Sequence, residues 1–191
     1  MPQPIVVMGV SGSGKTTAGT ALARRLGVPF ADADDFHPPA NIAKMAAGVP
    51  LDDADRAPWL RAVGAWLAAH PHGGVVTCSA LKRAFRDGLR AAAPTVRFVH
   101  LSGDPEVVRA RVANRAGHFM PVGLVTSQFA TLEPLAPDEA GLVLDLDRPV
   151  DALVDAYLGA HPTDRTTAPA AAVPAAALTA TVLTAEEGNP S

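Results

Sequence analysis

Residues 9–16 read Gly-Val-Ser-Gly-Ser-Gly-Lys-Thr and match the pattern G-x-x-x-x-G-K-[ST]. The glycines of this pattern allow a tight turn whose backbone N–H groups point into one concavity, which suits a phosphate group. The lysine can reach the β- and γ-phosphates of a nucleotide, and the threonine hydroxyl can bind Mg²⁺. We therefore predict a phosphate-binding P-loop, with Lys15 also catalytic, formed by Gly9, Val10, Ser11, Gly12, Ser13, Gly14, Lys15, Thr16 and Thr17.

The sequence on both sides of this motif is of the kind that a P-loop requires. Residues 5–8 form a short apolar run, which is typical of a buried parallel strand. After the motif, apolar residues recur at helical spacing as far as Leu26, and Gly27 stands where a helix C-cap belongs. A chance match in a Gly/Ser-rich turn would need neither a strand before it nor a helix after it. The context therefore favours nucleotide binding.

The remaining apolar segments alternate between strand-like and helix-like patterns. We predict further strands at 28–31, 75–78, 96–101 and 142–146, and further helices at 41–47, 53–69, 81–93, 105–112, 125–131 and 150–158. Asn41 is expected to cap the first of these further helices. Strands that alternate with helices indicate a parallel sheet covered on both faces. The predicted fold is α/β, with a P-loop NTPase-type sheet of five parallel strands sandwiched by helices.

Length and composition suggest the domain organisation and the location. A chain of 191 residues suits one domain, which we place at 1–160, because 161–191 are dominated by Ala, Thr and Pro and are expected to form a disordered tail. The net charge of −3 gives no basic footprint for nucleic acid. The single cysteine, Cys78, cannot form an internal disulfide, and the apolar run near the N-terminus is far shorter than the ~20 residues of a membrane span. We expect a soluble, cytoplasmic protein that binds neither nucleic acid nor membrane.

Two carboxylates follow the second predicted strand. Asp32 and Asp34 stand where that strand ends, and ligands of open α/β sheets bind beyond the carboxyl ends of the strands. Residues two apart in an extended segment point the same way, so both carboxylates are expected to face the bound phosphates. Asp32 would hold waters on Mg²⁺, and Asp34 would orient and deprotonate an acceptor hydroxyl. The alternative is that both aspartates only end the strand and cap a turn.

Two other classes of nucleotide-dependent protein find no support in the sequence. The chain contains no Asn-Lys pair and therefore lacks the Asn-Lys-x-Asp guanine motif of switch GTPases. The H-R-D motif of protein kinases is also absent. The paired aspartates instead favour transfer of a phosphoryl group to a small acceptor.

Longer sequence blocks resemble the gluconokinase family. These blocks are Asp34-Asp35-Phe36-His37-Pro38, Asn41-Ile42-Ala43-Lys44-Met45, 48–60, Cys78-Ser79-Ala80-Leu81-Lys82, Gly117-His118-Phe119-Met120 and Ser127-Gln128-Phe129. They occur in the family's order over about residues 4–158. The resemblance implies ATP- and Mg²⁺-dependent phosphorylation of D-gluconate to 6-phospho-D-gluconate, which feeds the pentose phosphate pathway, by a homodimer of NMP-kinase-like fold.

Cationic and hydrogen-bonding side chains that suit such an acceptor lie in the same blocks. Gluconate is a polyol with a carboxylate, so its site needs cations and polar groups rather than an apolar slot. The candidate substrate-binding residues are Asp34, His37, Asn41, Lys44, Arg56, Ser79, Lys82 and His118, with Arg86 one helical turn after Lys82. For each side chain taken alone, the alternative is an ordinary solvated surface residue.

Residues 109–124 resemble the mobile lid of such kinases. Arg111 and Arg115 are four apart and share a face of a helix, so both are candidates for catalytic contacts with the transferring phosphoryl group. The alternative is ordinary helix solvation, which we assign to Arg109. Asp104 and Asp145 end strands and are expected to cap turns, with support of the nucleotide or magnesium as the alternative.

Two alternatives to gluconate phosphorylation remain open from the sequence. One is another acceptor within the same fold, such as shikimate or a nucleotide, although shikimate kinases usually carry a Gly-Gly-Gly run after the third strand and a Gly-x-Arg-x-x-Gly-Arg segment, and neither occurs here. The other is a nucleotide-dependent switch or binding module without a small acceptor. The chain also departs from the gluconokinase pattern at Ala33, where that family often has glycine.

Overall fold

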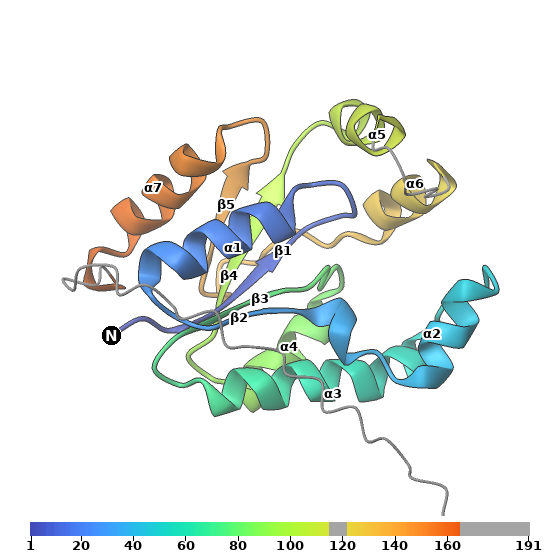
Figure 1. Cartoon of the computed structure of the whole chain (residues 1–191), viewed down its shortest axis with the longest axis horizontal. Helices are drawn as coiled ribbons and strands as arrows, with labels where there is room; N and C mark the ends of the chain where they lie inside the picture. Colours follow the sequence, from blue (N-terminus) through green and yellow to red (C-terminus); the bar gives the residue numbers. More distant parts are fainter. Residues whose placement is uncertain (115–121, 165–191) are drawn as a thin grey trace, which may run out of the picture.

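The computed structural model describes residues 1–114 and 122–164, and these form a five-stranded sheet with helices on both faces (Figure 1). All four strand pairings are parallel, and the strand order is β2-β3-β1-β4-β5. The strands are β1 (Pro4–Met8), β2 (Phe30–Asp32), β3 (Gly74–Thr77), β4 (Arg97–Ser102) and β5 (Gly141–Asp145). The helices are α1 (Lys15–Leu26), α2 (Pro39–Ala46), α3 (Asp53–Ala69), α4 (Arg83–Ala92), α5 (Pro105–Ala113), α6 (Val122–Thr131) and α7 (Val150–Ala160), with 3-10 turns η1 (Ala33–Phe36) and η2 (Pro162–Asp164). This confirms the predicted α/β fold.

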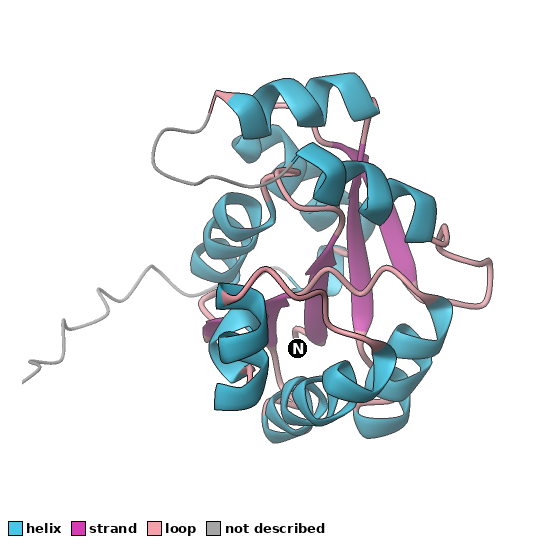
Figure 2. Cartoon of the chain, turned by 90° about the vertical axis from the view of Figure 1, so that its right-hand side faces the viewer, coloured by secondary structure: helices cyan, strands magenta, loops and turns pink. Residues whose placement is uncertain are grey.

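The sheet, with β1 at its centre, separates the core into two halves. The side chains of β1 alternate between the faces of the sheet, as the strand geometry requires. Ile5 and Val7 pack with α1 and α7 on one face, whereas Val6 and Met8 pack with α3 and α4 on the other. Figure 2 shows helices on both sides of the sheet. Because both faces are covered, β1 reads in the sequence as a continuous apolar run rather than an alternating one.

The ends of three neighbouring strands meet at one edge of the sheet. Thr77 of β3 is in register with Val7 of β1 on one side and with Asp32 of β2 on the other. The segments that follow these strands therefore start next to one another. They are the P-loop, the turn η1 and the loop that leads into α4.

One predicted helix start is wrong in detail. Asn41 does not cap α2, because the N-cap is Pro38 and Pro39 opens the helix. Asn41 lies one turn inside, where its side chain is buried and its Nδ2 donates to the Asp55 backbone oxygen at 2.8 Å. Proline suits the first helical turn because its missing N–H has no helical partner there.

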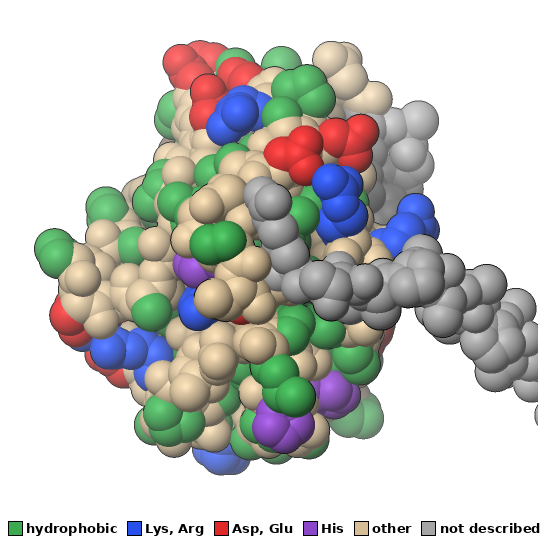
Figure 3. Space-filling view, turned by 90° about the vertical axis from the view of Figure 1, so that its left-hand side faces the viewer, with side chains coloured by type: hydrophobic (Ala, Val, Ile, Leu, Met, Phe, Trp, Pro, Cys, Tyr) green, Lys and Arg blue, Asp and Glu red, His purple; other side chains and the backbone are tan. Residues whose placement is uncertain are grey.

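The surface bears on two expectations made from composition. On the face drawn in Figure 3, Lys and Arg side chains lie among Asp and Glu side chains rather than in one basic patch. Within residues 1–114 and 122–164, none of the helices is both long and apolar enough to span a bilayer.

The packed chain continues to Asp164, past the expected domain end at residue 160. Asp164 is buried, and its Oδ2 accepts hydrogen bonds from Arg97 at 2.5 Å and from the Tyr157 hydroxyl at 2.9 Å. These contacts fasten the turn after α7 to β4. The folded domain therefore extends at least to Asp164.

This boundary makes a stability prediction. Deleting residues 165–191 should leave the melting temperature unchanged, because their composition suits no packed core. Asp164→Ala should instead cost about 1–3 kcal/mol, since it leaves buried donors without an acceptor. Asp155→Ala is the matched control, because the ion pair of Asp155 with Arg25 is exposed on both sides. Thermal unfolding measures all three, and equal melts for Asp164→Ala and the control would contradict the boundary.

Candidate active site

The phosphate-binding loop has the backbone that the sequence motif predicts. Gly12 and Gly14 adopt φ angles of 84° and 90°, in the left-handed region that favours glycine. A Cβ on Gly9 would stand 2.7 Å from the Leu101 backbone oxygen, so this position also excludes a side chain. The loop leads into the N-terminus of α1 at Lys15, and a helix N-terminus attracts anions.

Lys15 is half-buried at the mouth of this loop. Its Nζ donates to the Val10 backbone oxygen at 3.0 Å. Burial lowers the pKa of Lys15 from its ordinary value, and the carboxylates of Asp34 and Asp32 offset part of this effect. The lysine therefore lies within the electrostatic reach of both aspartates.

Asp32 connects the phosphate-binding loop to the turn η1. Its Oδ2 accepts a hydrogen bond from the Thr16 hydroxyl at 3.1 Å, and its Oδ1 accepts one from the Asp34 backbone N–H at 3.2 Å. The second bond makes Asp32 the N-cap of η1. The capping interpretation of this aspartate is confirmed, and the predicted magnesium role is compatible with it because capping uses only Oδ1.

Asp34 lies in a 3-10 turn, so the premise of an extended segment through both aspartates is wrong. The chain turns at Ala33, and Asp34 follows inside η1. Burial and the neighbouring Asp32 carboxylate raise the pKa of Asp34, while His37 and Lys15 act in the opposite direction. A carboxyl group with a raised pKa beside a P-loop lysine is a candidate proton acceptor.

Trp59 supports the turn that carries Asp34. Its indole Nε1 donates to the Ala33 backbone oxygen at 2.6 Å. Its ring stacks on His37 with centroids 4.6 Å apart and planes 9° from parallel. Burial lowers the pKa of His37, and the charge of Asp34 offsets part of this shift. A neutral His37 can therefore offer a hydrogen bond beside Asp34 without adding charge.

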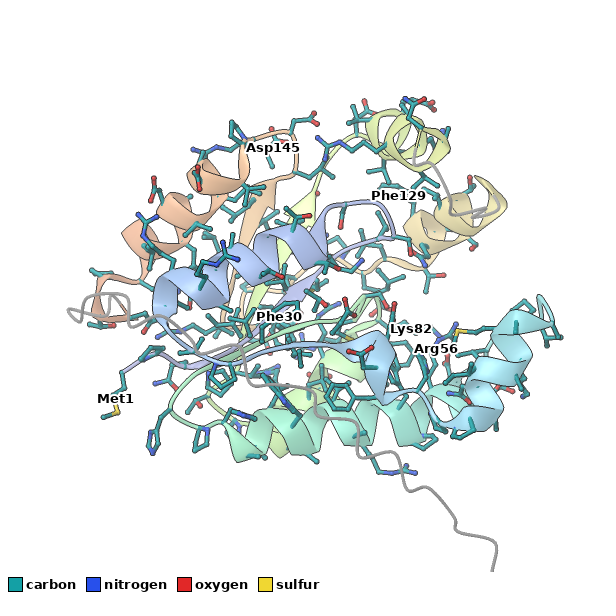
Figure 4. All side chains as sticks on the ribbon, in the orientation of Figure 1. Met1, Phe30, Arg56, Lys82, Phe129 and Asp145 are labelled. Carbon is teal, nitrogen blue, oxygen red and sulfur yellow. The ribbon has the colours of Figure 1, made fainter. Side chains whose placement is uncertain are left out.

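Three predicted substrate-binding cations are each paired with a carboxylate of α3. Lys82 Nζ lies 2.5 Å from Asp53 Oδ2, and Arg56 Nη1 lies 3.4 Å from Asp53 Oδ1. Lys44 Nζ lies 2.6 Å from Asp55 Oδ1. Figure 4 shows Arg56 and Lys82 near each other, where α3 begins and the loop after β3 ends. Because exposed ion pairs contribute only about 0–1 kcal/mol, a substrate carboxylate can compete with Asp53 at low cost.

The loop after β3 lies against the phosphate-binding loop. The Gly9 backbone N–H donates to the Ser79 backbone oxygen at 3.4 Å, which brings Ser79 next to the P-loop. Ala80 follows with a φ of 43°, unusual for a residue with a side chain. Cys78 is buried, which raises the pKa of its thiol to about 12 and keeps it protonated. This loop therefore offers the Ser79 hydroxyl and Lys82, but no reactive thiol.

Two residues predicted near the acceptor are held inside the protein. Arg86 is fully buried and forms an ion pair with the buried Glu139, with 2.6 Å between Nε and Oε1. It cannot bind gluconate directly, so that expectation is wrong. The amide of Asn41 is likewise engaged with the Asp55 backbone, and its Nδ2 lies 3.4 Å from His37 Nδ1. Asn41 would therefore act on substrate by holding His37 and α3 in place.

The predicted lid arginines are only partly described. Arg111 Nη2 lies 2.8 Å from Asp147 Oδ1, and Arg111 Nη1 donates to the Leu146 backbone oxygen at 3.1 Å. Its guanidinium is thus bound to the loop between β5 and α7 and would have to leave these contacts to reach a phosphoryl group. Arg115 and His118 lie outside the described residues. Arg109 pairs with Glu106, as expected of a surface residue.

Sequence reasoning missed the contact of α6 with the P-loop. Gln128 Oε1 accepts a hydrogen bond from the Ser11 backbone N–H at 2.6 Å, and Gln128 Nε2 donates to Ser11 Oγ at 3.1 Å. The Ser-Gln-Phe block had marked this glutamine without a role. Sequence reasoning also missed the ion pairs of Asp53 and Asp55 with the predicted substrate-binding cations. Acidic residues at the start of a helix are usually interpreted as stabilising the helix terminus.

The residues present fit a magnesium ion that is held mainly by a nucleotide. Within the described ranges, no group of three or more His, Cys, Asp or Glu side chains could hold a metal alone. The Thr16 hydroxyl at the helix N-terminus would bind the ion, and the Asp32 carboxylate beside it would hold the waters of the ion. Mg²⁺ commonly takes one or two protein oxygens together with substrate phosphates and waters.

Comparisons with known proteins agree with this geometry. The family model described as shikimate kinase matches residues 11–128. A gluconokinase from Gluconobacter oxydans is 51% identical over 141 residues, which cover 72% of this chain and 79% of that protein. A solved gluconokinase from Sinorhizobium meliloti is 46% identical with a TM-score of 0.76 and covers 83% of this chain and 90% of that chain. A sugar kinase from a Janibacter species is 49% identical with a TM-score of 0.78 and covers 87% of this chain and 99% of that chain.

Proposed function

The chain belongs to the shikimate kinase family of P-loop proteins and, within it, to the gluconokinases, and from this we infer that it phosphorylates D-gluconate to 6-phospho-D-gluconate at the expense of ATP. The observation that carries the inference is the position of Asp34. Asp34 follows β2, and only β3 separates β2 from β1, the strand that leads into the P-loop. The charges of Asp34 and Lys15 each influence the pKa of the other group. Asp34 also neighbours the segment that carries His37 and Arg56. A base, a phosphate-binding lysine and acceptor-binding cations therefore occupy one edge of the sheet.

We assign the steps of transfer to residues of this site. The P-loop N–H groups and Lys15 bind the β- and γ-phosphates. Asp34 accepts the proton of the 6-hydroxyl as the oxygen–phosphorus bond forms and the bond from the γ-phosphorus to the bridging oxygen of ADP breaks. Lys82, Arg56 and Lys44 bind the gluconate carboxylate and its neighbouring hydroxyls. Thr16 would hold Mg²⁺, with Asp32 on its waters, and the ion would neutralise charge on the phosphate oxygens.

Shikimate is the weaker candidate acceptor. The shikimate kinase model matches residues 11–128, a range that includes the P-loop residues from Ser11 onward and the proposed acceptor residues from Asp34 to Lys82, so the match alone does not name the acceptor. The segment after β3 here reads Cys78-Ser79-Ala80-Leu81-Lys82, without the Gly-Gly-Gly run usual in shikimate kinases. Gluconokinases are also the relatives with high identity.

A coupled assay of ADP release tests the proposed acceptor. The enzyme is given ATP and Mg²⁺ with gluconate, other sugar acids, shikimate or a nucleoside monophosphate. We expect gluconate to give the highest kcat/KM by a wide margin. A preference for shikimate, or ATP turnover that no acceptor changes, would contradict the proposal.

We further propose a cytoplasmic homodimer. This rests on the resemblance to gluconokinases and on the single buried cysteine, which suits a reducing compartment. Light scattering over a range of protein concentrations tests the dimer, and a monomer mass at all concentrations would refute it.

Acid inactivation should report the ionisation of Asp34. A base must be deprotonated, so kcat should fall as pH falls through a pKa that lies above the ordinary aspartate value of about 3.9. His37, whose pKa is lowered by burial, also gains a proton as pH falls and is the competing source of an acid limb. The acid limb of the kcat profile should therefore persist in His37→Gln. If that variant loses the limb, His37 and not Asp34 controls it.

Arg111 should act more on turnover than on binding. We expect Arg111→Ala to lower kcat about tenfold, equal to ~1.4 kcal/mol of transition-state stabilisation, with smaller changes in both Michaelis constants. Arg109→Ala is the control, because it removes the same charge from the same helix. A change confined to the Michaelis constant for ATP would instead make Arg111 a nucleotide-binding residue held by the β5–α7 loop.

A further inference from the structure

Gln128 meets both polar groups of one P-loop residue. Its amide oxygen accepts from the Ser11 backbone N–H, and its amide nitrogen donates to the Ser11 hydroxyl. Because the two bonds use the oxygen and the nitrogen of the same amide, they fix the orientation of the Gln128 side chain. Gln128 lies on α6, more than a hundred residues from the P-loop in sequence, so the contact is tertiary. Phe129, the next residue of α6, is labelled close to this loop in Figure 4.

The C-terminal end of α6, which follows Gln128 directly, is bonded to the loop that follows β3. The chain leaves the helix at Leu132, and the backbone N–H of Glu133 donates to the Leu81 oxygen at 2.8 Å. The Glu133 side chain accepts from the Arg83 N–H at 2.5 Å. Lys82 lies between Leu81 and Arg83, the two residues that these bonds hold. One short segment thus reaches from the P-loop to the loop that carries a proposed acceptor-binding lysine.

Buried Arg86 makes this connection stiff. Its guanidinium donates to the backbone oxygens of Ala80, Leu81, Glu133 and Pro134 and pairs with Glu139. Both side chains of the ion pair are fully buried. Because one guanidinium bonds backbone oxygens of both segments, moving either segment alone would break buried hydrogen bonds of a charged group, and we expect the two to move together.

We propose that Gln128 is a positioning residue that couples the nucleotide site to the acceptor site through α6. Phosphates bound in the P-loop change the position of Ser11, and Gln128 transmits this change of position to α6. Glu133 and Arg86 then pass it to the loop that holds Ser79 and Lys82. The inference rests on the proposed function only in naming the acceptor, since the bonded path itself does not depend on which acceptor binds. Coupling of this kind is reciprocal, so gluconate must tighten nucleotide binding by the same factor.

Binding measurements on the full chain test the coupling. Calorimetry gives the gluconate Kd alone and with a saturating β,γ-imido analogue of ATP and Mg²⁺. The parent protein should bind gluconate at least about fivefold more tightly with the analogue, the lower end of usual allosteric coupling. In Gln128→Ala this ratio should fall towards one, while in Thr131→Ala it should be unchanged. Thr131 is a matched control because its hydroxyl bonds only within α6, to the Ser127 backbone oxygen, among the contacts described.

Hydrogen exchange separates a failure of this proposal from a failure of the proposed function. If the parent protein does not bind gluconate, the proposed function fails, and the amides of 81–83 and of Leu132 and Glu133 still report the path. Adding the analogue should slow exchange of these amides in the parent protein and in Thr131→Ala, but not in Gln128→Ala. Equal slowing in Gln128→Ala, or an unchanged gluconate ratio in that variant, would overturn the proposal.

A second variant tests the location of the side chain. Gln128→Glu keeps an acceptor for the Ser11 N–H but adds a negative charge beside the phosphate-binding loop. It should weaken binding of the analogue severalfold at low salt and less at high salt, because salt screens the repulsion. An affinity for the analogue that is unchanged at low salt would show that Gln128 does not lie beside the bound phosphates, against the proposal.

Discussion

Lys15→Ala is expected to lower turnover by ~10²–10³ or more, the usual effect of removing a group that stabilises transition-state charge. The expected loss is large because the lysine is half-buried at the loop, where burial already lowers its pKa. Bound phosphates would reverse that shift and hold the ammonium charged. The interaction of the ammonium with the γ-phosphate therefore stabilises the transition state most, because negative charge moves during transfer.

The fold should survive this substitution. The glycine conformations shape the P-loop, and the lysine side chain contributes one hydrogen bond, to the Val10 oxygen. The thermal melt of Lys15→Ala should therefore match that of the parent. Arg24→Ala, an exposed cation on the same helix, is the control for loss of charge alone. Turnover of Lys15→Ala close to that of the Arg24 variant would show that this loop does not carry out catalysis.

The sheet and the P-loop could be predicted because their signals are local. Buried parallel strands read as short apolar runs, and the glycines, lysine and threonine of the motif must be consecutive to build the loop. The turn at Asp34 could be given only as an alternative, because sequence does not distinguish an aspartate that caps a turn from one that ends an extended strand. Asn41 was misplaced because a proline pair before it offered an earlier helix start.

Side chains that act through tertiary contacts could not be assigned from sequence. Arg86 has the same spacing after Lys82 whether it faces solvent or the core, and only the fold brings Glu139 to it. Gln128 reaches Ser11 across more than half of the chain. The ion pairs of Asp53 and Asp55 depend on how α2, α3 and the loop after β3 meet. Each of these contacts joins segments distant in sequence, and periodicity carries no information about such pairs.

Asp34→Asn should keep ATP binding and lose ~10²–10⁴ in turnover, the range for loss of a general base. The amide has the same shape, so it can still orient the 6-hydroxyl but cannot accept its proton. Because phosphoryl transfer passes through a loose transition state, much of the barrier depends on positioning, which favours the lower part of the range. The Michaelis constant for ATP should change little, since the P-loop is intact.

Asp32→Asn is the matched comparison, because the two aspartates share the same strand end but have different partners. Asp32 accepts from the Thr16 hydroxyl and would hold the waters of Mg²⁺, so its loss should raise the magnesium concentration needed for half-maximal rate. Turnover of both variants is measured against magnesium concentration at saturating ATP and gluconate. Excess magnesium should restore Asp32→Asn and leave Asp34→Asn slow. The reverse pattern would exchange the two assignments, because rescue by the metal marks the carboxylate whose partner is the metal and not the substrate proton.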